Sequence, residues 1–324
     1  MSFHRFLILS GLLSIGSFAK AAEPIWDANK IVLVSEKLGE GVFAVYPKNS
    51  KEENKKGQVS ATSGGIVVGT RATLVIDTML NKRMNESLQK QALNASKRKE
   101  ITYALNTSAH GDHSFGNMYL PRSTKVIQHI NTRSYIASHL DDDKKFMIQN
   151  FGAGRGIEEI KGREADILIP VNGKITLDLG GRSVDIIDFG FAQTGGDLFV
   201  WEPITQTLWA GNAINAPKPA LPWLLDGHIV DTYNTLKKVY DFLPEEAQII
   251  PGHGVAMKKE DLNWHIDYLD AVIRRVKDAI AQGLSLEETV AKVQLPEFQG
   301  YAIFGWIHQS VNVPAAYKEL KVKP

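Results

Sequence analysis

The feature that most constrains the fold of this chain is a set of four polar clusters, each at the end of a short apolar run. The clusters are "SAHGDH" (108–113), "FAQTGGD" (191–197), "LWAGNA" (208–213) and "IPGHG" (250–254). Short runs rich in Val and Ile that end in Gly or polar turns are typical of β-strands. Side chains on loops above a rigid scaffold commonly carry function, so we expect the four clusters to build one site.

The rest of the pattern predicts strands and helices in two successive halves. Strands are expected at 41–47, 64–69, 72–78, 101–107, 124–129, 173–179, 182–190, 197–203, 206–212 and 247–251. Helices are expected at 82–98, 132–150, 231–243 and 260–282, with Asp231 as an N-cap and Ser285 and Glu288 as a capping box for one more. The polar segment 48–58 is predicted to be an exposed loop that can act as a flap. Two packed sheets with helices outside would bury these runs, which indicates an α/β sandwich.

The N-terminus has the pattern of a secretion signal. The apolar run 6–18 is short, and Ala19-Lys20-Ala21 fits a small-x-small cleavage site. A short membrane anchor is the alternative, but the run is too short for a mature spanning helix. Cleavage near Ala21 would remove Arg5 and Lys20 and no acid, which leaves 35 basic and 36 acidic residues. We therefore expect a periplasmic or secreted bacterial protein without a stable membrane anchor.

Composition limits the chemistry that is available. The chain has no cysteine, so a metal would be held by His, Asp, Glu, Asn or Gln. Apolar residues make up 44% of the chain, which is enough for a sizeable core. Lys and Arg number 37 against 36 Asp and Glu, and no basic run favours nucleic acid as a partner. A small-molecule substrate is the expected partner, and the oligomeric state is left open.

The four clusters, in this order, resemble the metallo-β-lactamase superfamily. Its members show an HxHxDH motif, a His before a Thr-x-Gly-Asp-like turn, an Asp after an apolar strand and a His in a PGHG-like turn. The segment "GGIVVGTRATLVIDT" (64–78) also resembles the opening hairpin of that family, with Asp77 at the strand end. The resemblance implies an αβ/βα sandwich over residues 22–324, after a signal peptide at 1–21, with metal sites at one edge of the sheets.

Carried over residue by residue, the ligands of the family give two unequal halves. The first metal site falls on Ser108, His110 and Gln193, of which one is a good ligand. The position of the bridging aspartate is Asn212, a neutral amide. The second site falls on residues that all keep their ligand character: Asp112, His113 and His253. The resemblance thus implies one zinc held by a His₂Asp set, with Ser108, Gln193 and Asn212 as polar pocket groups or weak ligands.

A mono-zinc site of this kind predicts a hydrolase. Zinc lowers the pKa of a bound water and polarises a carbonyl, which suits an ester, lactone, thioester or amide. His110 and Asp112 are the candidate catalytic residues, with His110 as general base or proton shuttle. The Pro-rich segment 215–228 is expected to flank the pocket with Trp223 and His228.

Two other functions are compatible with the same residues. The first is a catalytically inactive protein that binds a small molecule or a partner on this fold. The second is an Fe(II) oxygenase, because two histidines and one carboxylate also suit iron. Family members with dioxygenase activity hold iron in the other site, which counts against this alternative.

Overall fold

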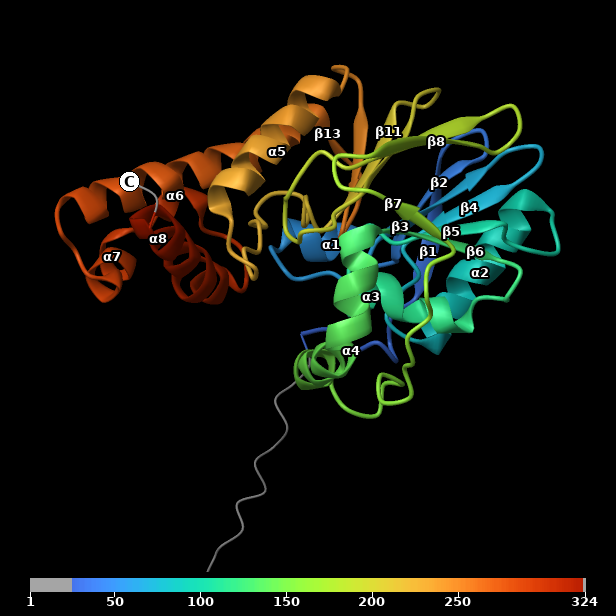
Figure 1. The fold of residues 1–324 in the computed structure, drawn as a ribbon, viewed down its shortest axis with the longest axis horizontal. Helices are drawn as coiled ribbons and strands as arrows, with labels where there is room; N and C mark the ends of the chain where they lie inside the picture. The colour runs from blue at the N-terminus through green and yellow to red at the C-terminus, as the bar shows by residue number, and fades with distance from the viewer. Residues whose placement is uncertain (1–24, 323–324) are drawn as a thin grey trace, which may run out of the picture.

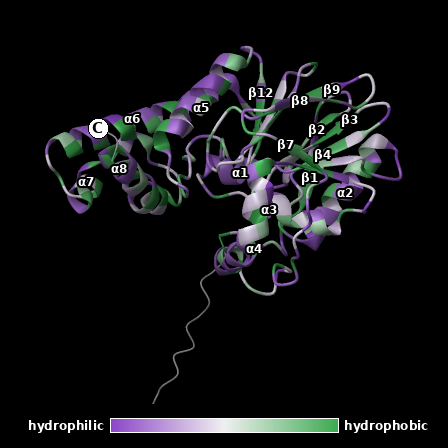
Figure 2. Ribbon diagram, in the orientation of Figure 1, coloured by the Kyte–Doolittle hydropathy of each residue, from purple (hydrophilic) through white to green (hydrophobic). Residues whose placement is uncertain are grey.

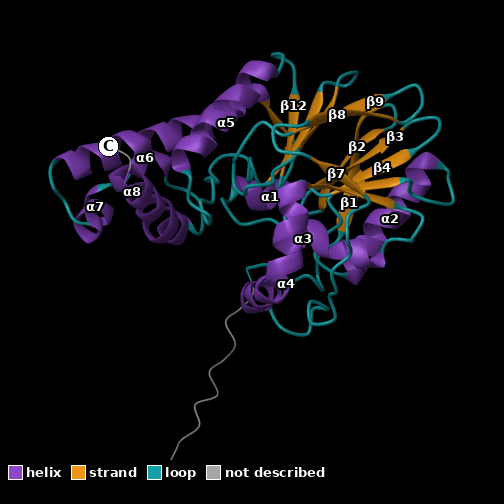
Figure 3. Ribbon diagram, viewed as in Figure 1, coloured by secondary structure: helices purple, strands orange, loops and turns teal. Residues whose placement is uncertain are grey.

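The computed structural model describes residues 25–322, and its strands form two mixed sheets (Figures 1 and 3). The first sheet has the spatial order β1 (Leu33–Gly39), β2 (Val42–Pro47), β3 (Gly64–Val68), β4 (Thr73–Ile76), β5 (Tyr103–Leu105), β6 (Lys125–His129), β7 (Ile167–Ile169). The second has the order β13 (Met257–Lys258), β12 (Gln248–Pro251), β11 (Thr207–Gly211), β10 (Phe199–Glu202), β9 (Ser183–Ile187), β8 (Lys174–Asp178). Each predicted strand is present, and β1, β7 and β13 were not predicted.

The described residues form eight α-helices, which are α1 (Ser50–Lys55), α2 (Lys82–Ser96), α3 (Gly111–Ser114), α4 (Ile130–Phe151), α5 (Ile229–Phe242), α6 (Asn263–Ala281), α7 (Leu286–Lys292) and α8 (Val313–Val322). The outer face of the first sheet shares a core with α2 and α4, and that of the second sheet shares one with α5 and α6. Figure 1 shows α5 to α8 gathered at one end of the molecule, away from α2 and α4. The layers therefore follow the order helix, sheet, sheet, helix, which confirms the predicted α/β sandwich.

The alternation of side chains along the strands explains this layering. In β4, Leu74 and Ile76 pack between the two sheets, whereas Val75 packs with the α2 layer. In β11, Trp209 lies between the sheets and Leu208 joins the core under α5 and α6. Figure 2 shows the central strands as largely hydrophobic and α5 and α6 as amphipathic. Each sheet is thus apolar on both faces, as a four-layer fold requires.

Most helix predictions are confirmed, and one cap is wrong. Ser285 and Glu288 form the predicted capping box, with the Glu288 N–H donating to Ser285 Oγ at 3.2 Å. Helix α5 begins at Ile229 after His228, so Asp231 lies in the first turn and is not the N-cap. Its carboxylate still suits the positive end of the helix and pairs with His228 Nδ1 at 3.2 Å.

The segment 48–58 is not the open loop that its polarity predicted. It contains α1, whose Ser50 Oγ lies 2.7 Å from Ser60 Oγ, and whose Asn54 Oδ1 accepts from the Val255 N–H at 3.2 Å. A Cβ at Gly254 would lie 2.3 Å from Asn54 Oδ1, and the φ of Gly254 is +112°. Glycine at this position therefore lets α1 pack against the turn that carries His253.

No helix within residues 25–322 is both long enough and apolar enough to cross a membrane. The predicted signal peptide and its cleavage site at Ala21 lie outside the described residues.

Candidate metal centre

Asp112, His113 and His253, called the triad below, come together from two sheets. Asp112 and His113 lie on α3, shortly after β5 of the first sheet ends, and His253 follows β12 of the second sheet. Asp112 Oδ2 lies 3.5 Å from Nε2 of His113 and 3.5 Å from Nε2 of His253. One ligand atom from each residue lies within 4.8 Å of the others, and all three side chains are buried. The sequence clusters at 108–113 and 250–254 thus meet as predicted.

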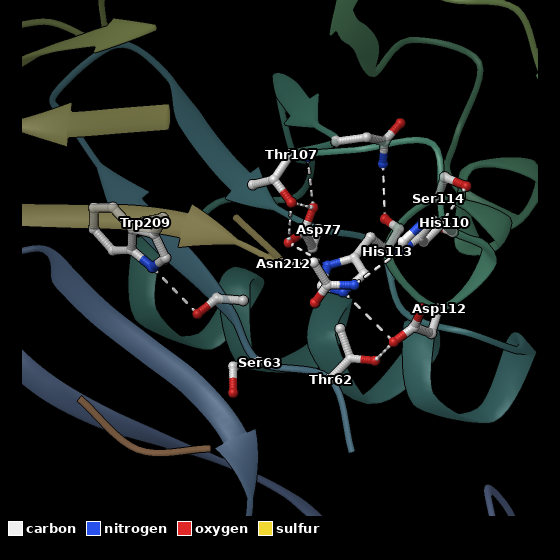
Figure 4. A network of polar contacts seen from close by, with 12 residues as sticks. Thr62, Ser63, Asp77, Thr107, His110, Asp112, His113, Ser114, Trp209 and Asn212 are labelled. Carbon is white, nitrogen blue, oxygen red and sulfur yellow. Dashed lines mark hydrogen bonds and ion pairs between the residues drawn. The ribbon is translucent and has the colours of Figure 1, made fainter. Parts of the chain in front are cut away.

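Each triad residue is held from behind by a partner. Asp77 Oδ2 accepts from His113 Nδ1 at 2.7 Å, and the Ser60 carbonyl accepts from His253 Nδ1 at 3.1 Å. Thr62 Oγ1 donates to Asp112 Oδ2 at 2.7 Å (Figure 4). With both Nδ1 atoms occupied, Nε2 of each imidazole faces the Asp112 carboxylate. Metal-binding histidines generally have such outer partners.

Asp77 is itself fixed at the end of β4. The Thr107 N–H and Thr107 Oγ1 donate to Asp77 Oδ1 at 2.8 and 3.0 Å. The φ of Asp77 is +58°, in the left-handed region that an aspartate rarely adopts. The backbone strain is balanced by these hydrogen bonds, which aim the carboxylate at His113.

The charges of the triad favour a cation between its side chains. Burial opposes the charged form of His113, but the carboxylates of Asp112 and Asp77 outweigh burial and raise its pKa to about 9. Burial dominates at His253 and lowers its pKa to about 4, although Asp112 opposes this change. Burial also opposes ionisation of Asp112, yet His113 and His253 hold the pKa of that carboxyl below its usual value. The buried His113 Nε2 has no hydrogen-bond partner within residues 25–322, so it can serve as a ligand once a metal replaces its proton.

Ser108 and Gln193, at the first metal site of the family, and Asn212, at the position of its bridging aspartate, are called the polar half below. All three are buried, and Ser108 Oγ, both amide atoms of Gln193 and Asn212 Oδ1 have no hydrogen-bond partner among the described residues. The Asn212 amide nitrogen donates to Nδ1 of His110 at 3.0 Å (Figure 4). Burial lowers the pKa of His110. One imidazole among neutral groups is a poor set of ligands for a second metal.

A cavity of about 300 Å³ opens beside the triad. Its lining includes His110, Asp112, Asn212 and His253, together with the predicted Trp223, whose ring is nearly parallel to that of His253 at a centroid distance of 6.5 Å. His228 lies outside this cavity, exposed in a groove formed with α8.

Several residues of the site were missed in the sequence. Thr62 and Ser60 belong to no motif, and they reach the triad because Thr62 forms an isolated bridge with His253. Trp26 and Phe151 line the cavity from segments that gave no functional signal. Asp77 could have been found, because its place at a strand end is part of the family resemblance.

Comparison with known proteins agrees with this geometry. The family model described as "Metallo-beta-lactamase superfamily" matches residues 57–253, so the chain belongs to that superfamily. A comparison with curated protein sequences gives no match. Among solved structures, a metallo-β-lactamase from Pontibacter korlensis aligns with a TM-score of 0.57 and 17% identity, over 74% of this chain and 99% of that one. DIM-1 metallo-β-lactamase exposed to ceftazidime aligns with a TM-score of 0.58 and 19% identity, over 74% of this chain and 98% of that one. VMB-1 aligns with a TM-score of 0.55 and 20% identity, over 74% of this chain and 97% of that one.

At these identities the solved structures establish the fold alone. The family model ends at His253, so α6, α7 and α8 lie beyond it.

Proposed function

We propose that this protein is a metal-dependent hydrolase that binds one zinc in the triad and attacks the carbonyl of an ester, lactone, thioester or amide. The observation that carries the proposal is the buried His₂Asp set, with both Nδ1 atoms engaged and a cavity alongside. Three such ligands suit zinc with one position open, whereas iron is a second possibility for the same donors. Bound zinc would supply an activated water and polarise the substrate carbonyl.

The side chains around the triad have separate tasks in this proposal. Asp77 and the Ser60 carbonyl fix which imidazole nitrogen carries the proton, so that Nε2 of each histidine remains a ligand. Thr62 fixes one carboxylate oxygen of Asp112. These contacts preorganise the ligands, so little rearrangement is needed when a metal binds.

His110 has a hydrogen-bonding role that follows from Asn212. An amide nitrogen can only donate, so Nδ1 of His110 accepts, and a neutral ring then carries its proton on Nε2. In this arrangement His110 is a donor that can stabilise negative charge on the substrate oxygen, as the donors of an oxyanion hole do. We therefore assign His110 the role of a hydrogen-bond donor at Nε2, and not that of a general base.

A screen of esters, lactones and thioesters with the zinc-loaded protein tests the proposal. We expect hydrolysis that is lost on chelation, returns with zinc and is absent in Asp112→Ala. Asp241→Asn, an exposed change on α5, is the matched control and should retain activity. Hydrolysis that persists in the chelated protein and in Asp112→Ala would overturn the proposal.

We also propose that the chain is exported, on the basis of the apolar run 6–18 and the Ala19-Lys20-Ala21 site. N-terminal sequencing of the protein from a periplasmic fraction should give a start near Ala22. A protein that begins at Met1 would contradict export by this signal.

A further inference from the structure

The cavity beside the triad is lined by buried candidate ligands at one end and by more exposed carboxylates elsewhere. Asp112 and His253 are buried, whereas Asp142 and Asp226 are exposed and Asp143 is half-buried. The acids come from α4 and from the 215–228 segment, which places negative charge on two sides of the cavity rim. No Lys or Arg is present among the described residues that line it.

Two of these three acids lack a compensating cation. Asp142 pairs with Lys145 at 2.8 Å. Asp143 and Asp226 form no ion pair with a basic side chain in the part of the chain that the structure describes. The Tyr135 hydroxyl donates to Asp143 Oδ1 at 3.1 Å, while Asp143 Oδ2 is inaccessible and without a partner in the described chain. The cavity rim therefore has an excess of negative charge.

The charge of Asp226 acts on Asp143. Burial raises the pKa of Asp143 to about 6, Tyr135 and His139 oppose the rise, and Asp226 and Asp142 add to it. Asp143 is still largely ionised near neutral pH. A positive group placed between Asp143 and Asp226 would relieve their repulsion.

The walls between this rim and the triad are mainly aromatic. Trp26 and Phe151 have ring centroids 4.5 Å apart, and Tyr135, Phe146 and Trp223 complete the aromatic lining. Such walls bury the apolar body of a ligand, and their faces also attract cations. The acids and the aromatic rings favour the same kind of ligand.

We infer that the substrate combines an apolar body with a cationic amine or quaternary ammonium group. The carbonyl lies at the triad, the apolar body lies along the aromatic walls, and the cation lies at Asp143 and Asp226. Anionic substrates are disfavoured, because the rim repels them and offers no Lys or Arg among the described lining residues. This inference rests on the proposed function, since it takes this cavity as the substrate pocket.

Binding of three matched probes to the zinc-loaded protein tests the inference without turnover. The probes are 4-phenylbutyl-trimethylammonium, 4-phenylbutanol and 4-phenylbutyrate, followed by calorimetry or by tryptophan fluorescence. We expect the cation to bind about tenfold more tightly than the alcohol, because charge attraction adds to the shared apolar contact. The double substitution Asp143→Asn and Asp226→Asn should remove most of this preference and leave the affinity for the alcohol unchanged.

Asp241→Asn is the matched control, since it removes an exposed aspartate that does not line this cavity. Equal affinity for the cation and the alcohol, or a preference that survives the double substitution, would overturn the inference. If only the hydrolase proposal fails, the zinc-loaded protein will hydrolyse no ester. It will still prefer the cation, and this preference will still depend on Asp143 and Asp226.

Discussion

The triad and the polar half occupy the same edge of the sandwich but differ in how their polar atoms are satisfied. Behind the triad, Asp77, Thr62 and Ser60 supply one hydrogen bond to each ligand. In the polar half, the atoms without a partner among the described residues belong to Ser108, Gln193 and Asn212 themselves. The outer partners of the triad both satisfy the buried ligand side chains and orient them, as such partners do around bound metals. The contrast supports the proposal that the triad holds a metal and that the polar half serves as a neutral hydrogen-bonding surface.

The largest expected difference between the halves is in metal affinity. Asp112→Ala should weaken zinc binding by more than the roughly 10–100-fold that loss of an outer partner costs. Gln193→Ala should change it by less than about threefold, because a neutral amide is not needed to complete the triad. Competition with a chromophoric chelator measures both. A Gln193→Ala variant that loses zinc as Asp112→Ala does would show that the polar half is also a ligand shell.

The next largest effect concerns the outer partners. Asp77→Asn should weaken zinc binding by roughly 10–100-fold, because His113 loses the carboxylate that fixes its Nδ1 proton. Asp197→Asn is the control. That buried carboxylate accepts the N–H groups of Ala192, Gln193 and Thr194 beside the polar half.

The control variant should lower the thermal stability and leave the zinc affinity unchanged. Equal losses of zinc affinity in Asp77→Asn and Asp197→Asn would mean that the triad responds to general destabilisation and not to its own partner.

A smaller effect is expected when charge is returned to the polar half. Asn212→Asp should destabilise the metal-free protein by about 1–3 kcal/mol, because it buries a carboxylate in place of an amide. Added zinc should recover more stability in this variant than in the wild type, because the new charge lies beside the metal ligands. Thermal unfolding with and without zinc measures both effects, and equal recovery by zinc would contradict the second.

The smallest expected effect is on the pH dependence of stability, and it concerns His265, a buried histidine outside the triad. His265 donates to the Ala216 carbonyl at 2.9 Å, and burial lowers its pKa to about 4 from 6.5. Between pH 4 and pH 6.5 His265 binds a proton more readily in the unfolded chain than in the folded protein. The contribution of neutral His265 to the free energy of unfolding is therefore fully present above pH 6.5 and is lost as the pH falls toward 4. Between pH 6.5 and about 5.5 the loss should be about 1 kcal/mol.

Chemical denaturation of the wild type and of His265→Gln, both free of metal, checks this expectation. The loss should be smaller in His265→Gln by the share of His265, while the share of His253, whose pKa is also lowered to about 4, remains. A variant with the same acid sensitivity as the wild type would exclude His265 as a source.

The sequence predicts the sandwich well because its apolar runs are local signals. In runs such as 72–78 and 247–251 the apolar residues that indicate a strand are neighbours in the sequence. The strands β4 and β12 lie within these two runs. The strand β1 was missed because its sequence, "LVSEKLG", is charged, and it pairs with β2 as an edge strand. The helix α1 was missed because its support is tertiary, through Ser60 and Val255.

Only the site residues that belong to sequence motifs could be predicted. The triad and Asn212 lie in recognisable turns, so the sequence identified them. Thr62 reaches the site through a bridge with His253, and Trp26 and Asp143 reach it through packing of distant segments, which no local pattern records. The placement of Asp143 and Asp226 at one cavity is likewise a property of packing, and it carries the inference about the substrate.

Zinc content tests the central claim most directly. The protein and its His253→Ala variant would be purified without chelators and analysed for metals by elemental mass spectrometry. We predict about one zinc per chain in the wild type and almost none in the variant. Two metals per chain, or none even after zinc is supplied, would contradict it.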